Sequence, residues 1–357
     1  MSSDESSTPP PSPADGTAQA ESRPLPPVEA PTGTFIVQLF LVPLVIVTII
    51  VGTWLLVGWL AHADADPYRL AEDIRRQGPG SWQKAYTLSN MLHSRQYEGL
   101  RRDRKLCGIL IAALEDALPV QVEKDEDVQY RVFLCRALGE FDVGDPLPIL
   151  VQAMQLESSQ PTEVRLAAVQ GLAVIADRLG SRVIAQRPEV TATLVAITQE
   201  PPEGEDPRAI RELQAAAAFA LGVVGGDVAT HRLVALLDDA YPNTRYNAAT
   251  GLAWQGDARA LPVLLEMLDP DNPALLQGER TGSQQATSPT TKQVLESRQL
   301  LVISSAISAV TRLCRSSAEI DRQAVRKALE KIARSRIPSS VKLEATEALI
   351  VLKKSEQ

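Results

Sequence analysis

The chain has 357 residues and a formal net charge of −8, with 36 Lys and Arg against 44 Asp and Glu. This acidic balance argues against a nucleic-acid-binding protein, because such surfaces carry an excess of basic residues. Aromatic residues make up only 4% of the chain while Ala and Leu abound, which favours helices over sheets. Cys107, Cys135 and Cys314 lie far apart in apolar helical runs, so we expect small core residues and no disulfide framework.

Residues 1–34 contain eight prolines together with Ser, Thr, Ala and acidic residues. Such a segment cannot bury enough apolar surface to offset the entropy of ordering it, so we expect a disordered tail. Its PPPSP and PLPP strings also favour polyproline II, a conformation that docks in aromatic grooves.

The next segment, Phe35 to Ala61, contains 27 residues without a charge. A bilayer core is crossed by roughly 20 apolar helical residues, so the sequence predicts one transmembrane helix, kinked near Pro43 and with Trp54 and Trp59 near one interface. A buried core helix and a cleaved signal peptide are the alternatives. The small residues Ala61 and Ala63 favour cleavage, whereas the missing basic N-terminal region and the long apolar run oppose it.

Basic residues beside this segment predict its orientation. Arg69, Arg75 and Arg76 follow it closely, and only Arg23 precedes it at a comparable distance. Unpaired thiols also suit a reducing compartment. We therefore expect a single-pass membrane protein whose large C-terminal domain is cytoplasmic, with residues 62–80 as a juxtamembrane linker.

A short sequence segment with the periodicity of a helix recurs in the remaining chain, and we call each copy a phrase. In three copies an Arg precedes a Leu by seven residues, and Lys342 precedes Leu349 at the same distance. The copies are YRVFLCRALGEF from Tyr130, EVRLAAVQGLAVI from Glu163, LQAAAAFALGVVG from Leu213, TRYNAATGLAWQG from Thr244 and VKLEATEALIVL from Val341. Their apolar residues form one helical stripe. After a short Gly or Asp turn, a second amphipathic helix follows, as in PLPILVQAM from Pro146 and ARALPVLLEML from Ala258.

The strings EVRLAAVQGLA and TRYNAATGLAWQGDARALPVLLEML resemble HEAT repeats, in the broad bacterial version that includes the PBS-lyase-like group. The resemblance implies an all-α fold, an α-solenoid of stacked helix-turn-helix repeats over residues 81–357, with an atypical first pair from Ser81 to Leu118. An insert at residues 270–297, rich in Pro, Gly, Ser, Thr and Gln, is expected to be a disordered loop.

Acidic residues recur at the turns between paired helices, at Asp145, Asp227 and Asp257. They are suited to capping the helix that follows. The resemblance to HEAT solenoids implies in addition that these acids pair with arginines of adjacent repeats, namely Arg131, Arg165 and Arg245. We expect this ladder to be structural and not a ligand-binding row.

Residues suited to catalysis or metal binding are scarce. The three histidines, His62, His93 and His231, have no second ligand at metal-binding spacing, and no phosphate loop, nucleophile elbow or dinucleotide fingerprint is present. We therefore expect no cofactor, no metal and no enzymatic activity. The leading hypothesis is a membrane-anchored scaffold that binds partner proteins at the bilayer. The alternatives are an accessory subunit of a transport or secretion complex, and a lyase of the PBS-lyase group.

The binding surface is predicted from solenoid geometry. We expect the second helices of the pairs to form the concave face, so that polar residues on their solvent side contact the partner. The candidates are Gln152, Gln155, His231, Arg232, Arg259, Glu266, Lys327 and Lys331.

Overall fold

The computed structural model describes residues 33–61, 66–155, 159–201, 206–276, 289–316 and 320–354. All regular elements in these ranges are helices, as expected. The chain divides into two compact units, residues 1–64 and residues 65–357. The predicted disorder of residues 1–32 lies outside the described residues.

The described residues of the first unit form helix α1 (Gly33–Ala61), which continues through Pro43. Apolar side chains along it are exposed, including Phe40 and Trp54 at 69% and 74%. Among the described residues there is no helix with both the length and the apolar character that a membrane span requires.

The second unit begins with a helix where the sequence suggested a linker. Helix α2 (Pro67–Arg75) buries Ala71 and Ile74 completely. The Tyr130 hydroxyl donates to the Ile74 carbonyl at 2.9 Å, and Lys84 forms an ion pair with Asp73 at 2.8 Å. The expectation of a linker over residues 62–80 is therefore wrong from Pro67 onward, because two apolar residues on one face of a short helix suffice to dock it.

The repeats follow in helical pairs. The atypical first pair is α3 (Ser81–His93) and α4 (Arg104–Ala117), joined by the 3-10 helix η1 (Arg95–Arg102). The next elements are α5 (Asp125–Gly139) with α6 (Leu147–Met154), α7 (Thr162–Leu179) with α8 (Ser181–Ala185) and α9 (Pro188–Gln199), α10 (Pro207–Val224) with α11 (Asp227–Leu236), and α12 (Pro242–Trp254) with η3 (Ala258–Ala260) and α13 (Leu261–Met267). The last are α14 (Pro273–Leu276), α15 (Pro289–Ser316), α16 (Arg322–Arg334) and α17 (Ser339–Lys354).

The predicted insert is shorter than expected. Residues 273–276 form α14, and α15 already begins at Pro289, so the expectation of a loop over residues 270–297 is wrong at both ends. Residues 277–288 lie outside the described residues. Proline is favoured in the first turn of a helix, where its missing N–H is not needed, and both helices begin with one.

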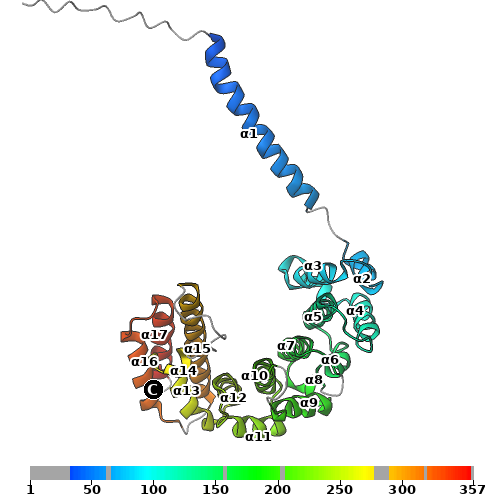
Figure 1. Cartoon of the computed structure of the whole chain (residues 1–357). Coiled ribbons are helices and arrows are strands. Elements are labelled where there is room, and N and C mark those ends of the chain that lie inside the picture. Colours follow the sequence, from blue (N-terminus) through cyan, green and yellow to red (C-terminus); the bar gives the residue numbers. More distant parts are fainter. Residues whose placement is uncertain are drawn as a thin grey trace, which may run out of the picture. The chain divides into compact units, whose positions relative to one another are not determined.

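Within the second unit the helices form a curved stack (Figure 1). Helices α3, α5, α7, α10 and α12 follow its inner side, and α4, α6, α9 and α11 follow its outer side. We call these the inner and outer helices. The expectation that the second helices of the pairs form the concave face is therefore wrong, because the repeated phrases themselves lie on the inner side.

Glycine contacts explain this curvature. A Cβ placed on Gly139 of α5 would lie 2.5 Å from the Cα of Gly171 in α7, and one on Gly222 of α10 would lie 2.5 Å from the Cα of Gly251 in α12. Only hydrogen atoms separate the backbones at these crossings. Because the inner helices approach so closely while larger side chains occupy the space under the outer helices, the stack bends toward the inner side.

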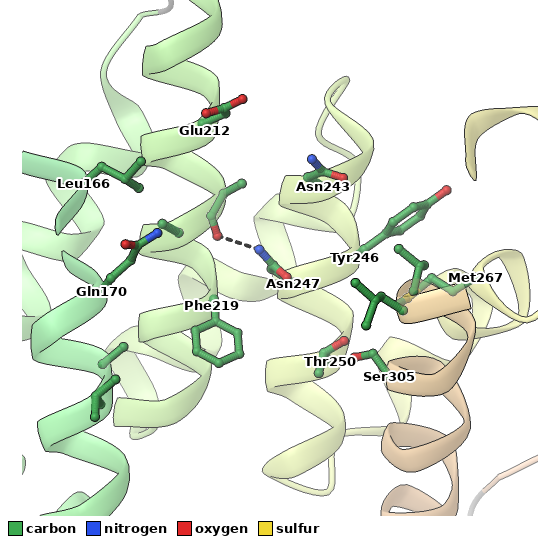
Figure 2. A pocket seen from close by; sticks show the side chains of 16 residues that line it. Leu166, Gln170, Glu212, Phe219, Asn243, Tyr246, Asn247, Thr250, Met267 and Ser305 are labelled. Carbon is green, nitrogen blue, oxygen red and sulfur yellow. Dashed lines mark hydrogen bonds between the residues drawn. The ribbon is translucent and has the colours of Figure 1, made fainter. Parts of the chain in front are cut away.

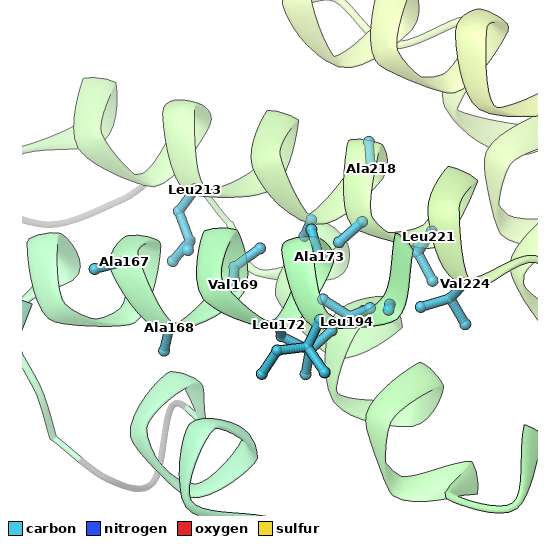
Figure 3. Packing of buried hydrophobic residues seen from close by; sticks show 14 of the residues in the cluster. Ala167, Ala168, Val169, Leu172, Ala173, Leu194, Leu213, Ala218, Leu221 and Val224 are labelled. Atoms are coloured by element: carbon cyan, nitrogen blue, oxygen red, sulfur yellow. The ribbon is translucent and has the colours of Figure 1, made fainter. Parts of the chain in front are cut away.

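The core runs between the two helix series. Figure 3 shows Leu172 of α7 and Leu194 of α9 meeting there, with alanines such as Ala173 between α7 and α10. Leu172 and Leu194 are fully buried. The three cysteines are also buried and free, as expected, and burial raises the pKa of Cys135 to about 12.

Candidate protein-binding groove

A ladder of buried polar side chains holds each inner helix in place. Arg165 of α7, 3% exposed, donates through Nε to the Met154 carbonyl at 3.0 Å, and through both terminal nitrogens to the Glu200 carboxylate at 2.9 and 2.7 Å. It therefore connects the end of the preceding outer helix to the end of the next one. A bidentate arginine pair of this kind fixes both distance and orientation.

The other repeats use the same arrangement. Arg131 donates to the Val120 carbonyl and to Gln160, each at 2.6 Å. Arg245 donates to the Asp239 carbonyl at 2.9 Å and to Glu266 at 2.8 Å. The ladder predicted for Arg131, Arg165 and Arg245 thus exists, with a carbonyl and a side chain as partners in each rung.

The partners expected for these arginines are nevertheless wrong. Asp145 lies 3.8 Å from Arg104, and Asp257 pairs with Arg259 at 2.5 Å and accepts from its backbone N–H, which confirms its capping role. Asp227 begins α11. The actual partners, Gln160, Glu200 and Glu266, lie beyond the turns, where the arginine side chains reach when the helices stack.

A fourth rung was not predicted. In α10 the residue seven positions before the buried Leu221 is Gln214, and its amide donates to the Glu200 carbonyl. The same spacing that relates Arg165 to Leu172 identifies this position. Gln214 carries an amide at the position where the other rungs carry an arginine, so a pattern based on basic residues does not include it.

The inner helices enclose a groove of about 580 Å³. Figure 2 shows its lining side chains, which come from α7, α10, α12 and α15 together with Met267 of α13. Apolar side chains are exposed there: Val174 at 37%, Phe219 at 38% and Leu301 at 71%. Phe219 also packs edge-on against Trp254, with ring centroids 5.4 Å apart.

Amide and hydroxyl groups lie among these apolar residues. Asn247 donates to the Ala215 carbonyl at 2.8 Å, which fixes the orientation of its side chain (Figure 2). Gln170 and Ser305 are exposed in the lining. Glu212, the acidic residue of the lining, lies 3.4 Å from Arg208, so its charge is largely compensated.

Tyr246 forms the wall between α12 and α13. Burial raises the pKa of its hydroxyl above the usual value, and so does the hydrogen bond that the hydroxyl donates to Glu266 at 2.9 Å. The phenol therefore stays neutral at physiological pH. The groove as a whole combines apolar surface with neutral polar groups and one carboxylate, Glu212, which forms an ion pair with Arg208.

A second hollow of about 230 Å³ extends the groove along the inner side. It is lined by residues of α3, α5 and α7, and it shares Gln170 and Val174 with the groove. At its edge Glu140 accepts from Arg178 at 2.8 Å and contacts Nδ1 of His93 at 2.9 Å. Burial would raise the pKa of Glu140, but the hydrogen bonds from Arg178 and His93 outweigh it and hold the pKa below its usual value.

The eight binding candidates from the sequence do not come together. Gln152 and His231 are exposed on the outer helices α6 and α11, and Gln155 is the C-cap of α6. The other candidates lie on α11, η3, α13 and α16. Arg232 is half-buried and donates to Thr198 at two positions, each at 2.8 Å. Arg232 thus joins α11 to α9 of the preceding repeat, and Glu266 joins α13 to α12 within one repeat, so both residues make structural contacts.

Lys327 and Lys331 do line one common hollow. It measures about 870 Å³ and lies between α13 and α16. Lys331 forms ion pairs there with Asp269 at 2.6 Å and Asp271 at 2.8 Å. Although this hollow is larger than the inner groove, Lys331 forms ion pairs with two acidic residues across it, whereas the inner groove exposes large apolar side chains.

Metal ligands are not clustered in the part of the chain that the structure describes. His93 is engaged with Glu140, and His231 is exposed on α11. His62 lies outside the described residues.

Comparison with known proteins identifies the repeats. Residues 205–281, which include α10 to α14, match the family model described as HEAT repeats. Residues 205–281 contain HEAT repeats. This match confirms the family resemblance of the phrases that begin at Leu213 and Thr244, and the all-helical stack is consistent with an α-solenoid. No curated protein matches the sequence.

Solved structures also match this chain, and one of them covers most of its length. It is human deoxyhypusine hydroxylase in complex with glycerol, with 15% identity over 81% of this chain and 96% of that chain. The TM-score of 0.28 is low. Such a likeness says nothing about activity.

Proposed function

We propose that this protein is a non-catalytic HEAT-repeat scaffold that is anchored in a membrane and binds a protein partner in the inner groove. The observation that carries the binding site is the exposure of Val174, Phe219 and Leu301 in one concave surface. Exposed apolar side chains gathered in a groove and edged by polar groups are typical of interaction sites.

The chemistry of the groove favours a protein segment over a charged ligand. Its exposed polar groups are amides and hydroxyls, such as Gln170, Asn243 and Ser305. These groups hydrogen-bond a peptide equally well as donors or acceptors. The apolar residues supply contact area for side chains of the segment, and Glu212 is compensated by Arg208.

The membrane anchor in this proposal is Phe35 to Ala61, and it rests on the sequence alone. The segment has 27 uncharged residues, more than the roughly 20 that a span requires. We place the HEAT repeats in the cytoplasm because Arg69, Arg75 and Arg76 follow the segment closely. Nucleic acid is not a partner in this proposal.

The groove is tested by pull-down of the full chain in mild detergent, with mass spectrometry of the recovered proteins. Leu301→Glu places a charge in the groove at a residue that is 71% exposed, and Val228→Glu does the same on outer helix α11 at a residue that is 62% exposed. We expect Leu301→Glu to reduce partner recovery about tenfold, equivalent to about 1.4 kcal/mol, and Val228→Glu to leave it unchanged. Equal recovery of the partner with both variants would contradict the proposal that it binds in the inner groove.

The anchor and its orientation are tested separately. Deletion of residues 35–61 should release the protein from membranes. A cysteine introduced by Val228→Cys should react with a membrane-impermeant maleimide only after permeabilisation. The native cysteines of the HEAT repeats are buried, so their background reaction is small. Labelling of intact cells would place the repeats outside the cytoplasm.

A further inference from the structure

The inner helices share a surface that contacts the following repeat. It consists of the residues one, four and eight positions after the ladder residue, and we call it the stacking stripe. In α5, α7, α10 and α12 these residues are Val132, Cys135 and Gly139; Leu166, Val169 and Ala173; Ala215, Ala218 and Gly222; and Tyr246, Ala249 and Ala253. Its direction is shown by Gly139 and Gly222, which abut Gly171 and Gly251 of the next inner helix. All twelve residues are buried except Leu166, which is half-buried.

Helix α17 has the same stacking stripe, but there the stripe is exposed to solvent. Lys342 occupies the ladder position, so the stripe consists of Leu343, Thr346 and Ile350. Leu343 is 59% exposed and Ile350 is 52% exposed. The opposite side of α17 is buried through Val341, Ala345, Ala348 and Leu352. Helix α17 is therefore apolar on two sides, and the described residues cover only one of them.

We propose that this stripe packs against α17 of a second copy of the chain, antiparallel and related by a twofold axis near Ile350. The first reason is continuity, because the stripes of α5, α7, α10 and α12 are each covered by the next long helix of the stack, namely α7, α10, α12 and α15. The second is charge complementarity. Glu347 and Lys354 are exposed and lie three residues before and four residues after Ile350 on the same side of the helix.

An antiparallel pair centred on Ile350 places Glu347 of one copy beside Lys354 of the other, and the symmetry repeats this contact. A self-complementary patch of this kind is what a twofold interface requires. A single helix face is smaller than the about 800 Å² per partner of a standard interface. The association is therefore weak in dilute solution and increases when copies share a membrane or micelle. It does not depend on the inner groove.

Cross-linking of the full chain in detergent tests the contact. With Ile350→Cys the thiols of two copies meet at the axis, so mild oxidation should give a disulfide-linked dimer. Val228→Cys, equally exposed on α11, is the matched control and should stay monomeric. Equal dimer yields from the two variants would overturn the proposal.

Charge reversal distinguishes a second copy from any other partner. In the Ile350→Cys background, Glu347→Lys places two lysines together at each contact and should slow dimer formation at least tenfold, and Lys354→Glu should do the same. The variant that combines Glu347→Lys with Lys354→Glu again places opposite charges at each contact. This holds only if residue 347 of one copy faces residue 354 of the other across the twofold axis. Recovery of the dimer in the double variant supports the proposal, and failure to recover with unchanged circular dichroism overturns it.

Discussion

The inner helices and the outer helices pack through residues of different size. Inner helices meet through glycines, as at Gly222 and Gly251, where a single added methyl group would collide with backbone. Outer helices bury larger residues such as Leu110 and Leu194 against them. The comparison teaches that curvature, and with it the concave groove, follows from where the small residues lie.

The two series also differ in how they use charge. Arg165 and Arg131 of the inner helices are almost completely buried, and their partners are fixed carbonyl and side-chain oxygens. Away from the inner helices, Arg259 of η3 and Lys331 of α16 form ion pairs that are exposed to solvent. We therefore expect inner-helix substitutions to change stability far more than outer-helix substitutions.

The largest effect is expected for Arg165→Ala. It leaves the Glu200 carboxylate, 11% exposed, and the Met154 carbonyl without their partner. Removing one member of a buried ion pair costs about 3–5 kcal/mol. Urea unfolding followed by circular dichroism measures the loss. The double variant Arg165→Met/Glu200→Leu should lose less, because no buried charge remains. A loss below about 1 kcal/mol in the single variant would show that water replaces the arginine.

Next in size is Gly222→Ala. Its methyl group would lie 2.5 Å from the Cα of Gly251, so α10 and α12 must move apart. Overpacking of this kind costs about 1–3 kcal/mol. The matched control is Gly108→Ala in α4, where nothing lies within 4 Å of the new Cβ. There the better helix propensity of Ala should raise stability by up to about 1 kcal/mol. Thermal unfolding of both variants gives the comparison, and equal shifts would contradict the close approach.

A smaller loss of stability is expected at low pH, and it depends on the carboxyl group of Glu140. Its pKa is held below the usual value of 4.5 by Arg178 and His93. A carboxyl group with a depressed pKa in the folded state contributes stability that is fully present above pH 4.5 and is lost as the pH falls through the folded pKa. The Glu140→Gln variant should therefore be less stable than the wild type at pH 7 and show a smaller decrease in stability between pH 4.5 and pH 3. Parallel pH profiles would exclude this contribution.

The smallest effect is expected for Arg259→Ala on the outer side. Its side chain is 59% exposed, and its pairing with Asp257 is local. Exposed ion pairs contribute about 0–1 kcal/mol. Arg245→Ala, in the ladder, is the control that should cost clearly more in the same urea titration. If the two variants were equally stable, the distinction between inner and outer charges would be wrong.

Much of this architecture follows from local pattern. The helical period of the phrases places Leu138, Leu172, Leu221 and Leu252 in the core, and the structure buries all four completely. The glycine-rich turn after α10 is also readable from the sequence, since Gly225 and Gly226 adopt positive φ values of 69° and 86°. Such features depend on residues close together in the chain.

The partners of the ladder arginines could be identified only from the tertiary structure. Gln160 and Glu200 lie at the ends of connections that differ in length between repeats, so no common spacing relates them to Arg131 and Arg165. The groove depends on residues of α7, α10, α12 and α15, which are brought together only by stacking. Phe219 and Leu301 look in the sequence like any other apolar residues of a helix.

The sequence by itself therefore determined that this protein is a series of helical pairs, where each helix has its apolar stripe, and where the buried arginines lie. Only the tertiary structure decided which helix series is concave and what each arginine binds. The physical reason is that a stripe of small residues shows only that two helices approach closely. The bend of the whole stack depends on how much closer together the inner helices lie than the outer helices. That difference is a property of many repeats together and is not encoded in any one of them.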